Sequence, residues 1–165
     1  MTLYQAIVVL HVLAALLWLG GMFFLAVVAA PVLRGVDPPE VRAVLFQRIG
    51  LRFRAVGWGA IGVLVATGAA SLWLRGVLSG GVLGDRAFWG TPFGRALAWK
   101  LAAVAGMVAL SAVHDFVLGP RASRLAGRRD REAVRARRAA AWLARANALL
   151  GLLLVWAAVR LARGG

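Results

Sequence analysis

Three side chains that can transfer protons or bind metals follow one another at intervals of seven residues, namely Lys100, Met107 and His114. On an α-helix this spacing places them on nearly the same face. Lys100 is the single lysine among the 20 basic residues, and its amine, unlike a guanidinium, can lose a proton when buried. A second stripe with the same spacing holds Tyr4, His11 and Trp18. Imidazole and thioether groups bind metals, so both stripes are candidate functional sites.

The elements that position these residues are long apolar segments. Of the 165 residues, 62% are hydrophobic, and the mean hydropathy is +0.80. A helix needs about 20 apolar residues to cross the hydrocarbon core of a membrane. Four segments approach or exceed this length, and they cover about residues 3–32, 55–74, 96–118 and 139–162. The sequence therefore predicts an all-α integral membrane protein, a four-transmembrane-helix up-down bundle.

The distribution of arginine predicts the topology and explains the net charge of +14. Basic residues concentrate between the first two spans and between the last two, and these loops share one side of the membrane. Cytoplasmic loops are enriched in Lys and Arg. We therefore expect loops 33–54 and 119–138 to lie in the cytoplasm against an anionic inner leaflet, with both termini outside. The expected location is the plasma or inner membrane. We expect no nucleic-acid partner.

The predicted bundle forms one membrane domain over residues 1–165. Within it, Val41, Leu45, Ile49 and Phe53 recur every four residues among arginines. This pattern indicates a short interfacial amphipathic helix at about residues 39–54. The first span begins too close to the N-terminus and is too long for a cleaved signal, so we expect it to be retained. The chain has no cysteine, which excludes disulfides and thiolate metal sites.

Depth in the membrane separates the candidate ligands. His11 and Lys100 lie in the outer half of their spans at a similar depth, where they can meet, whereas His114 lies near the inner end. At about 1.5 Å per residue the two histidines are roughly 20 Å apart along the membrane normal, while trans ligands on one iron need nitrogens about 4 Å apart. Either there are two sites, or one histidine binds a cofactor and the other forms only hydrogen bonds, or both only hydrogen-bond neighbouring helices.

A second polar group lies near the inner end of the bundle. Asp115 and Arg145 are expected at about the same depth, with Asn147 beside them. Neither charge is tolerated alone in hydrocarbon, so an ion pair between Asp115 and Arg145 is one expectation. The alternative is that Arg145 extends towards the headgroups.

Three segments together resemble the copper-resistance D (CopD) membrane domain. Thr91-Pro-Phe-Gly94-Arg95-Ala-Leu-Ala-Trp-Lys100 resembles its T-x-x-G-R-x-L-x-x-K segment. His11 to Gly21 is similar to its first helix, and Arg52-Phe53 through Thr67-Gly68 is similar to its R-F…T-G helix. The placement of His11, Lys100 and His114 is also similar to that in the J-type protoporphyrinogen oxidases, which bind b-type haem.

The resemblance implies copper handling or haem-linked redox chemistry, with His11 and His114 as candidate metal ligands and Lys100 as a candidate proton carrier. Trp18, Lys100 and Met107 join the two histidines as candidate cofactor contacts. Three functions remain open: a haem b electron-transfer protein with a quinone or redox partner, a copper transport or homeostasis protein, and a cofactor-free assembly subunit. The scarcity of methionine and the lack of cysteine favour haem. An enzyme would then be a haem-linked oxidoreductase, and a bundle of this size often pairs as a homo-oligomer.

Overall fold

The computed structural model describes residues 2–125 and 131–162, and these residues form helices and turns without a β-strand. Four helices are long and apolar enough to cross a membrane, as predicted for the all-α class, and they cover Leu3–Arg34, Pro39–Leu74, Pro92–Ala122 and Val134–Trp156. In chain order the elements are α1 (Leu3–Phe24), the π-helical segment η1 (Leu25–Ala29), α2 (Ala30–Arg34), α3 (Pro39–Leu74), α4 (Gly80–Gly84), α5 (Arg86–Gly90), α6 (Pro92–Ala112), the π-helical segment η2 (Val113–Leu118), α7 (Gly119–Arg124) and α8 (Arg131–Ala162).

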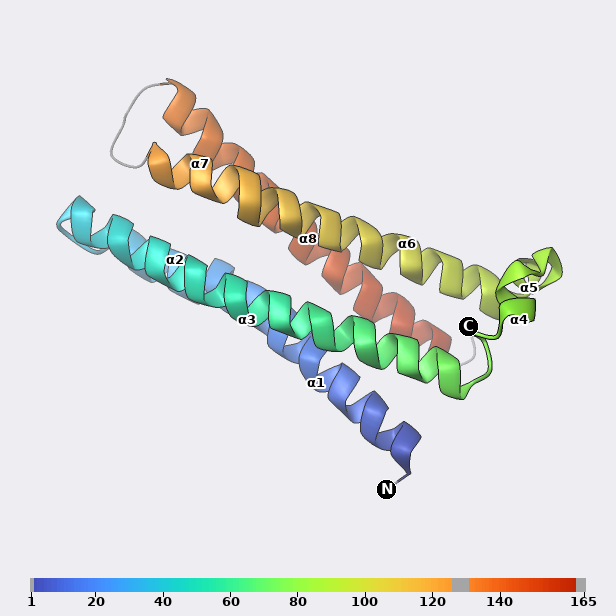
Figure 1. Cartoon of the computed structure of the whole chain (residues 1–165). Helices are drawn as coiled ribbons and strands as arrows, with labels where there is room; N and C mark the ends of the chain where they lie inside the picture. Colours follow the sequence, from blue (N-terminus) through green and yellow to red (C-terminus); the bar gives the residue numbers. More distant parts are fainter. Residues whose placement is uncertain (1, 126–130, 163–165) are drawn as a thin grey trace.

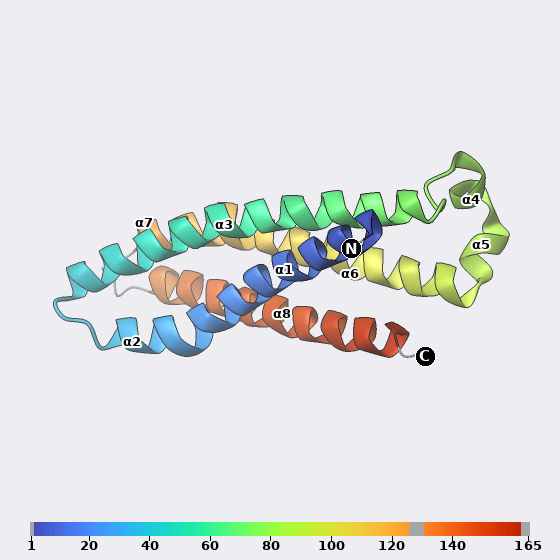
Figure 2. The same ribbon diagram turned by 90° about the horizontal axis from the view of Figure 1, so that it is seen from below.

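The long helices run side by side along one axis (Figure 1). α1 packs most extensively against α3, α6 packs against α8, and contacts between α1 and α8 join the two pairs. Figure 2 shows α2 and α7 near one end of the bundle and the short helices α4 and α5 at the other. We call the first the arginine-rich end and the second the α4–α5 end. The chain therefore has the multi-pass architecture of a membrane protein.

The segment expected to form a separate interfacial helix is instead the first half of α3. This helix continues from Pro39 to Leu74 over 36 residues, which corresponds to about 54 Å. No proline interrupts the helix after Pro39, and single glycines such as Gly50 and Gly57 weaken a helix without ending it. The amphipathic part and the membrane span are thus one continuous rod.

Two π-helical segments precede the prolines inside the first and third spans. η1 ends one residue before α2, whose second residue is Pro31, and η2 is followed by Pro120 in α7. A proline within a helix removes one backbone donor and clashes with the carbonyl four residues earlier. A wider π turn relieves this conflict and rotates the residues that follow it. In the third span the π turn contains His114 and Asp115.

The core of the bundle lies midway along these helices. Trp18, Ala60, Ile61 and Met107 form its buried cluster, and the Met107 side chain is only 2% exposed. Glycine makes the close packing possible, because a Cβ at Gly151 would lie 3.2 Å from Cε of Met107 and would overlap Leu19. Trp18, predicted as a cofactor contact, is thus a core residue from α1, and Met107 is the most deeply buried side chain beside it.

Candidate functional site

One polar group lies between α1 and α3 towards the α4–α5 end and is centred on His11. The Nδ1 atom of its ring lies 2.8 Å from Oγ1 of Thr67, which is itself buried. The Thr67 hydroxyl donates its single proton to the carbonyl oxygens of Val63 at 2.6 Å and Leu64 at 3.3 Å. Thr67 must therefore accept from His11, so Nδ1 carries the proton. The lone pair of Nε2 remains available for a metal or a proton.

The surroundings of His11 leave room for its ring. A Cβ at Gly68 would lie 3.6 Å from Cε1 of the His11 ring, which is an ordinary van der Waals contact. The Lys100 side chain lies exposed on α6. Its proximity to His11 stays a prediction.

Replacement of Thr67 by valine should destabilise the protein and release the His11 ring. The change removes a hydroxyl that accepts one bond and donates another, and the loss of a buried hydrogen bond costs about 1–3 kcal/mol. Chemical unfolding in detergent measures this difference, with Thr67→Ser as the control that retains the hydroxyl. Equal stability of the Thr67→Val and Thr67→Ser variants would show that the bond to His11 does not hold the ring.

A second group lies at the centre of the bundle and joins α1, α6 and α8. The buried Asn147 side chain donates from Nδ2 to Oγ of Ser111 at 2.8 Å and to Sδ of Met22 at 3.7 Å. Met107 belongs to the buried core cluster, and Met22 is partly buried and packs against it. The Oδ1 atom of Asn147 is buried and accepts no hydrogen bond from the described residues. An orphaned acceptor inside a membrane bundle calls for a functional explanation.

A third group lies towards the arginine-rich end and is centred on Asp115. One carboxylate oxygen lies 2.9 Å from Nδ1 of His114, and the other accepts from the Trp58 indole at 3.0 Å. Arg54 donates to the Asp115 backbone carbonyl at 3.1 Å and lies over the Phe116 ring. His114 therefore has a carboxylate partner that can orient its imidazole.

The expected ion pair between Asp115 and Arg145 is not formed. Asp115 is held by His114 and Trp58, and the guanidinium of Arg145 lies 5.6 Å from the centre of the Trp142 ring. Similar depth did not bring the two charges together, because Arg145 lies on an exposed face of α8 while Asn147, two residues later, faces the interior. The alternative, that Arg145 lies on the helix surface, matches its exposure.

The predicted residues thus fall into three levels. His11 is at the first, Met107 with Trp18 at the second, and His114 at the third. Thr67 and Trp58, which contact the two histidines, lie nine residues apart on α3, or about 14 Å. Within residues 2–125 and 131–162 no three His, Cys, Asp or Glu side chains gather around one point. Sequence analysis missed Ser111 and the pairing of Asn147 with Met22, since neither follows a spacing rule.

The segment Thr91 to Lys100 has a structural role at the start of α6. Thr91 caps the helix by accepting from the Gly94 amide at 3.0 Å, and Arg95 donates to the Gly90 carbonyl at 2.9 Å. A Cβ at Gly94 would lie 2.8 Å from the carbonyl carbon of Phe88 and still closer to its oxygen. The threonine, glycine and arginine of this motif therefore fix the turn from α5 into α6, as the Thr91-Pro92 pair predicts.

Comparison with known proteins connects this arrangement to one family. The family model described as "Copper resistance protein D" matches residues 47–161, which include most of α3, all of α6 and nearly all of α8. A protein of Aquifex aeolicus (strain VF5), described as uncharacterized, is 33% identical over 156 residues, which cover 94% of this chain and 92% of the relative. No solved structure matches the chain significantly. The family match covers more than half of the chain, and this chain therefore belongs to the copper resistance protein D (CopD) family.

Proposed function

We propose that the protein is a copper-homeostasis membrane protein that carries Cu⁺ through its helix bundle. The observation that carries the proposal is the central group. Met107 belongs to the buried core cluster, Met22 is partly buried and packs against that cluster, and both lie between the His11 level and the His114 level. Family membership supports the same proposal, because the description of the family, copper resistance protein D, refers to copper.

The ligand types suit a soft monovalent ion that moves. Thioether sulfurs and imidazoles bind Cu⁺ in preference to Mg²⁺ or Ca²⁺, which prefer oxygen. The free Nε2 of His11 offers an entry ligand, Met22 and Met107 offer sulfur halfway, and His114 beside Asp115 offers an imidazole near the arginine-rich end. Each level has few ligands, and a conducted ion must bind well enough to enter but weakly enough to leave.

The haem alternative rests on His11. Its Nδ1 is held by Thr67, so Nε2 would be the atom that could bind the iron of a haem. The fit is incomplete, because a second histidine at the level of His11 would be needed to hold the same iron from both sides. The chain has one other histidine, His114, and it lies at the third level, where it contacts Asp115, which also accepts from Trp58. A bound haem would supply one-electron chemistry. An absorption spectrum of protein purified from haem-replete cells tests this alternative, which requires a Soret band that His11→Ala weakens.

Equilibrium binding of Cu⁺ tests the proposed function. Protein in detergent, without oxygen, should remove Cu⁺ from a chromophoric chelator. Replacing both Met22 and Met107 by leucine should weaken this binding by about tenfold or more, equivalent to roughly 1.4 kcal/mol. Methionine and leucine have similar volumes, so the core should remain packed. Ile61→Leu changes the same cluster without removing sulfur and serves as the control.

Absence of Cu⁺ binding by the wild-type protein would contradict the proposal. Undiminished binding by the double variant would instead exclude the central sulfurs as ligands.

A further inference from the structure

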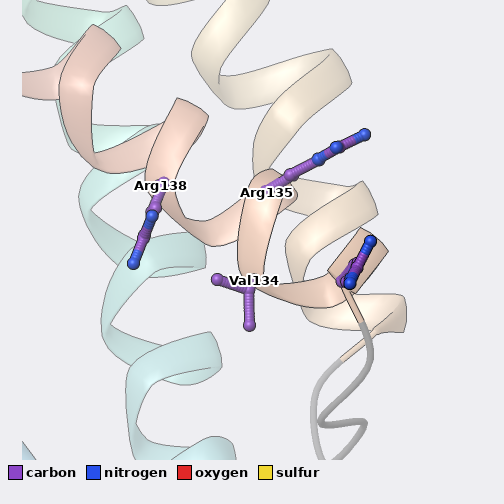
Figure 3. A pocket seen from close by; sticks show the side chains of 4 residues that line it. Val134, Arg135 and Arg138 are labelled. Carbon is purple, nitrogen blue, oxygen red and sulfur yellow. The ribbon is translucent and has the colours of Figure 1, made fainter.

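A row of arginines follows one face of α8 at its first turns. Arg131, Arg135 and Arg138 are spaced by four and three residues, which places them on one side of the helix. Together with Val134 they line an open hollow of about 250 Å³ (Figure 3). The three arginines give this open hollow the positive charge and the donors to attract a phosphate. Figure 3 shows the Arg135 and Arg138 side chains extending in different directions, so they would turn towards a bound anion.

No carboxylate of the described residues neutralises these three arginines. The ion pairs in this part of the chain join Arg121 to Glu132 and His114 to Asp115, and Glu132 is thus already paired with α7. Arg135 and Arg138 lie at the start of the apolar stretch Val134–Trp156 of α8. Positive charges next to a membrane span are stabilised by an anion. Among the described residues no carboxylate supplies that negative charge.

The same face of α8 changes from basic to aromatic to apolar. Trp142 and Arg145 follow the arginines, with the Arg145 guanidinium over the Trp142 ring. Trp142 is 68% exposed, and rings of this kind lie at the level of lipid headgroups. Beyond it come three exposed leucines, Leu149, Leu152 and Leu153. This order matches an amphiphile with a negative headgroup and hydrocarbon chains.

We propose that this face of α8 binds an anionic phospholipid as a specific, saturable ligand. The phosphate of the lipid lies in the hollow between Arg131, Arg135 and Arg138, and the glycerol region lies beside Trp142. The acyl chains follow the exposed leucines, which begin about 16 Å from Arg138 along the helix. The proposal is independent of copper transport, since none of these residues belongs to the three interior levels.

Native mass spectrometry of the whole protein in detergent tests the proposal with three probes, phosphatidylglycerol, phosphatidylcholine and inorganic phosphate. We expect phosphatidylglycerol to saturate one site and the other two probes to compete poorly. Changing Arg131, Arg135 and Arg138 together to glutamine should weaken phosphatidylglycerol binding by about tenfold or more, because three charge-assisted contacts are lost. The matched control changes three exposed arginines elsewhere, Arg48, Arg52 and Arg86, to glutamine.

Equal binding of phosphatidylglycerol and phosphatidylcholine would overturn the proposal, because it would show no preference for an anionic headgroup. An equal loss in both triple variants would also overturn it, because that result indicates attraction by net charge alone. Competition by inorganic phosphate at the same concentration would show a free-anion site instead of a lipid site. If the glutamine triple does not fold, Arg135→Gln alone should weaken binding by about threefold, and unchanged binding by this variant would also contradict the proposal.

Discussion

Replacement of Met107 by leucine should slow the entry of Cu⁺ into proteoliposomes by about tenfold or more while the helix content stays unchanged. Met107 is the most deeply buried side chain of the central cluster, and Met22 packs against this cluster. Leucine fills a similar volume but offers no sulfur, so the expected effect is chemical and not steric. The measurement is the initial rate of Cu⁺ accumulation in vesicles that contain a trapped Cu⁺ indicator.

The control for Met107→Leu is Ile61→Leu, which alters a neighbouring side chain of the same buried cluster. Its uptake rate should remain close to that of the wild type. A normal rate in Met107→Leu would remove Met107 from the path, and an equal loss in both variants would attribute the effect to packing.

Replacement of Gly94 by alanine should lower the free energy of unfolding by about 2–4 kcal/mol, because a forced overlap inside a tight turn is among the costly classes of substitution. The added methyl group would overlap the Phe88 carbonyl, which is backbone and cannot rotate away. The conflict would open the turn from α5 into α6 and weaken the Thr91 cap. Chemical unfolding in detergent, followed by circular dichroism, measures the loss.

Gly90 provides the matched control for this experiment. It lies four residues earlier in the same turn region, and a Cβ there would meet no atom within 4 Å. Gly90→Ala should therefore leave the free energy of unfolding nearly unchanged. Equal stability of the two variants would mean that the contact between α5 and α6 is not as close as the structure places it.

The spans were predictable from sequence because hydrocarbon leaves the backbone few alternatives to a helix. The start of α6 was equally predictable, since Thr91 and Pro92 are a cap and a first-turn residue whose preferences are local. The continuity of α3 was not, because whether an amphipathic segment bends away from the span that follows depends on tertiary contacts. The rotation of each helix about its own axis could not be predicted from the sequence either. The π turn of η2 changes this rotation around His114 and Asp115.

The same distinction explains the outcome for the candidate site. Depth can be counted along a sequence, so the separation of His11 from His114 could be predicted. Partners across helices depend on which faces meet. Asp115 therefore accepts a hydrogen bond from Trp58 and does not pair with Arg145. Asn147 donates hydrogen bonds to Ser111 and Met22. The sequence shows that Asn147 is a polar residue deep in an apolar segment. This position indicates a functional or structural site but does not predict which residue Asn147 contacts.

The first and third spans share one sequence of elements. Each runs from a long α-helix through a π-helical segment into a short helix that contains proline and a basic residue, as α1–η1–α2 and α6–η2–α7. The two π segments differ in content, since η1 is entirely apolar whereas η2 contains His114 and Asp115. The polar group of η2 lies at the third level of the proposed copper path.

The most direct test of the account is uptake of Cu⁺ by the purified wild-type protein in sealed vesicles with a trapped Cu⁺ indicator. The account predicts a saturable rate well above that of empty vesicles, lowered by about tenfold or more in the Met22→Leu, Met107→Leu double variant. A wild-type rate equal to that of empty vesicles, with the protein shown to be folded and inserted, would contradict the claim that Cu⁺ passes through this bundle.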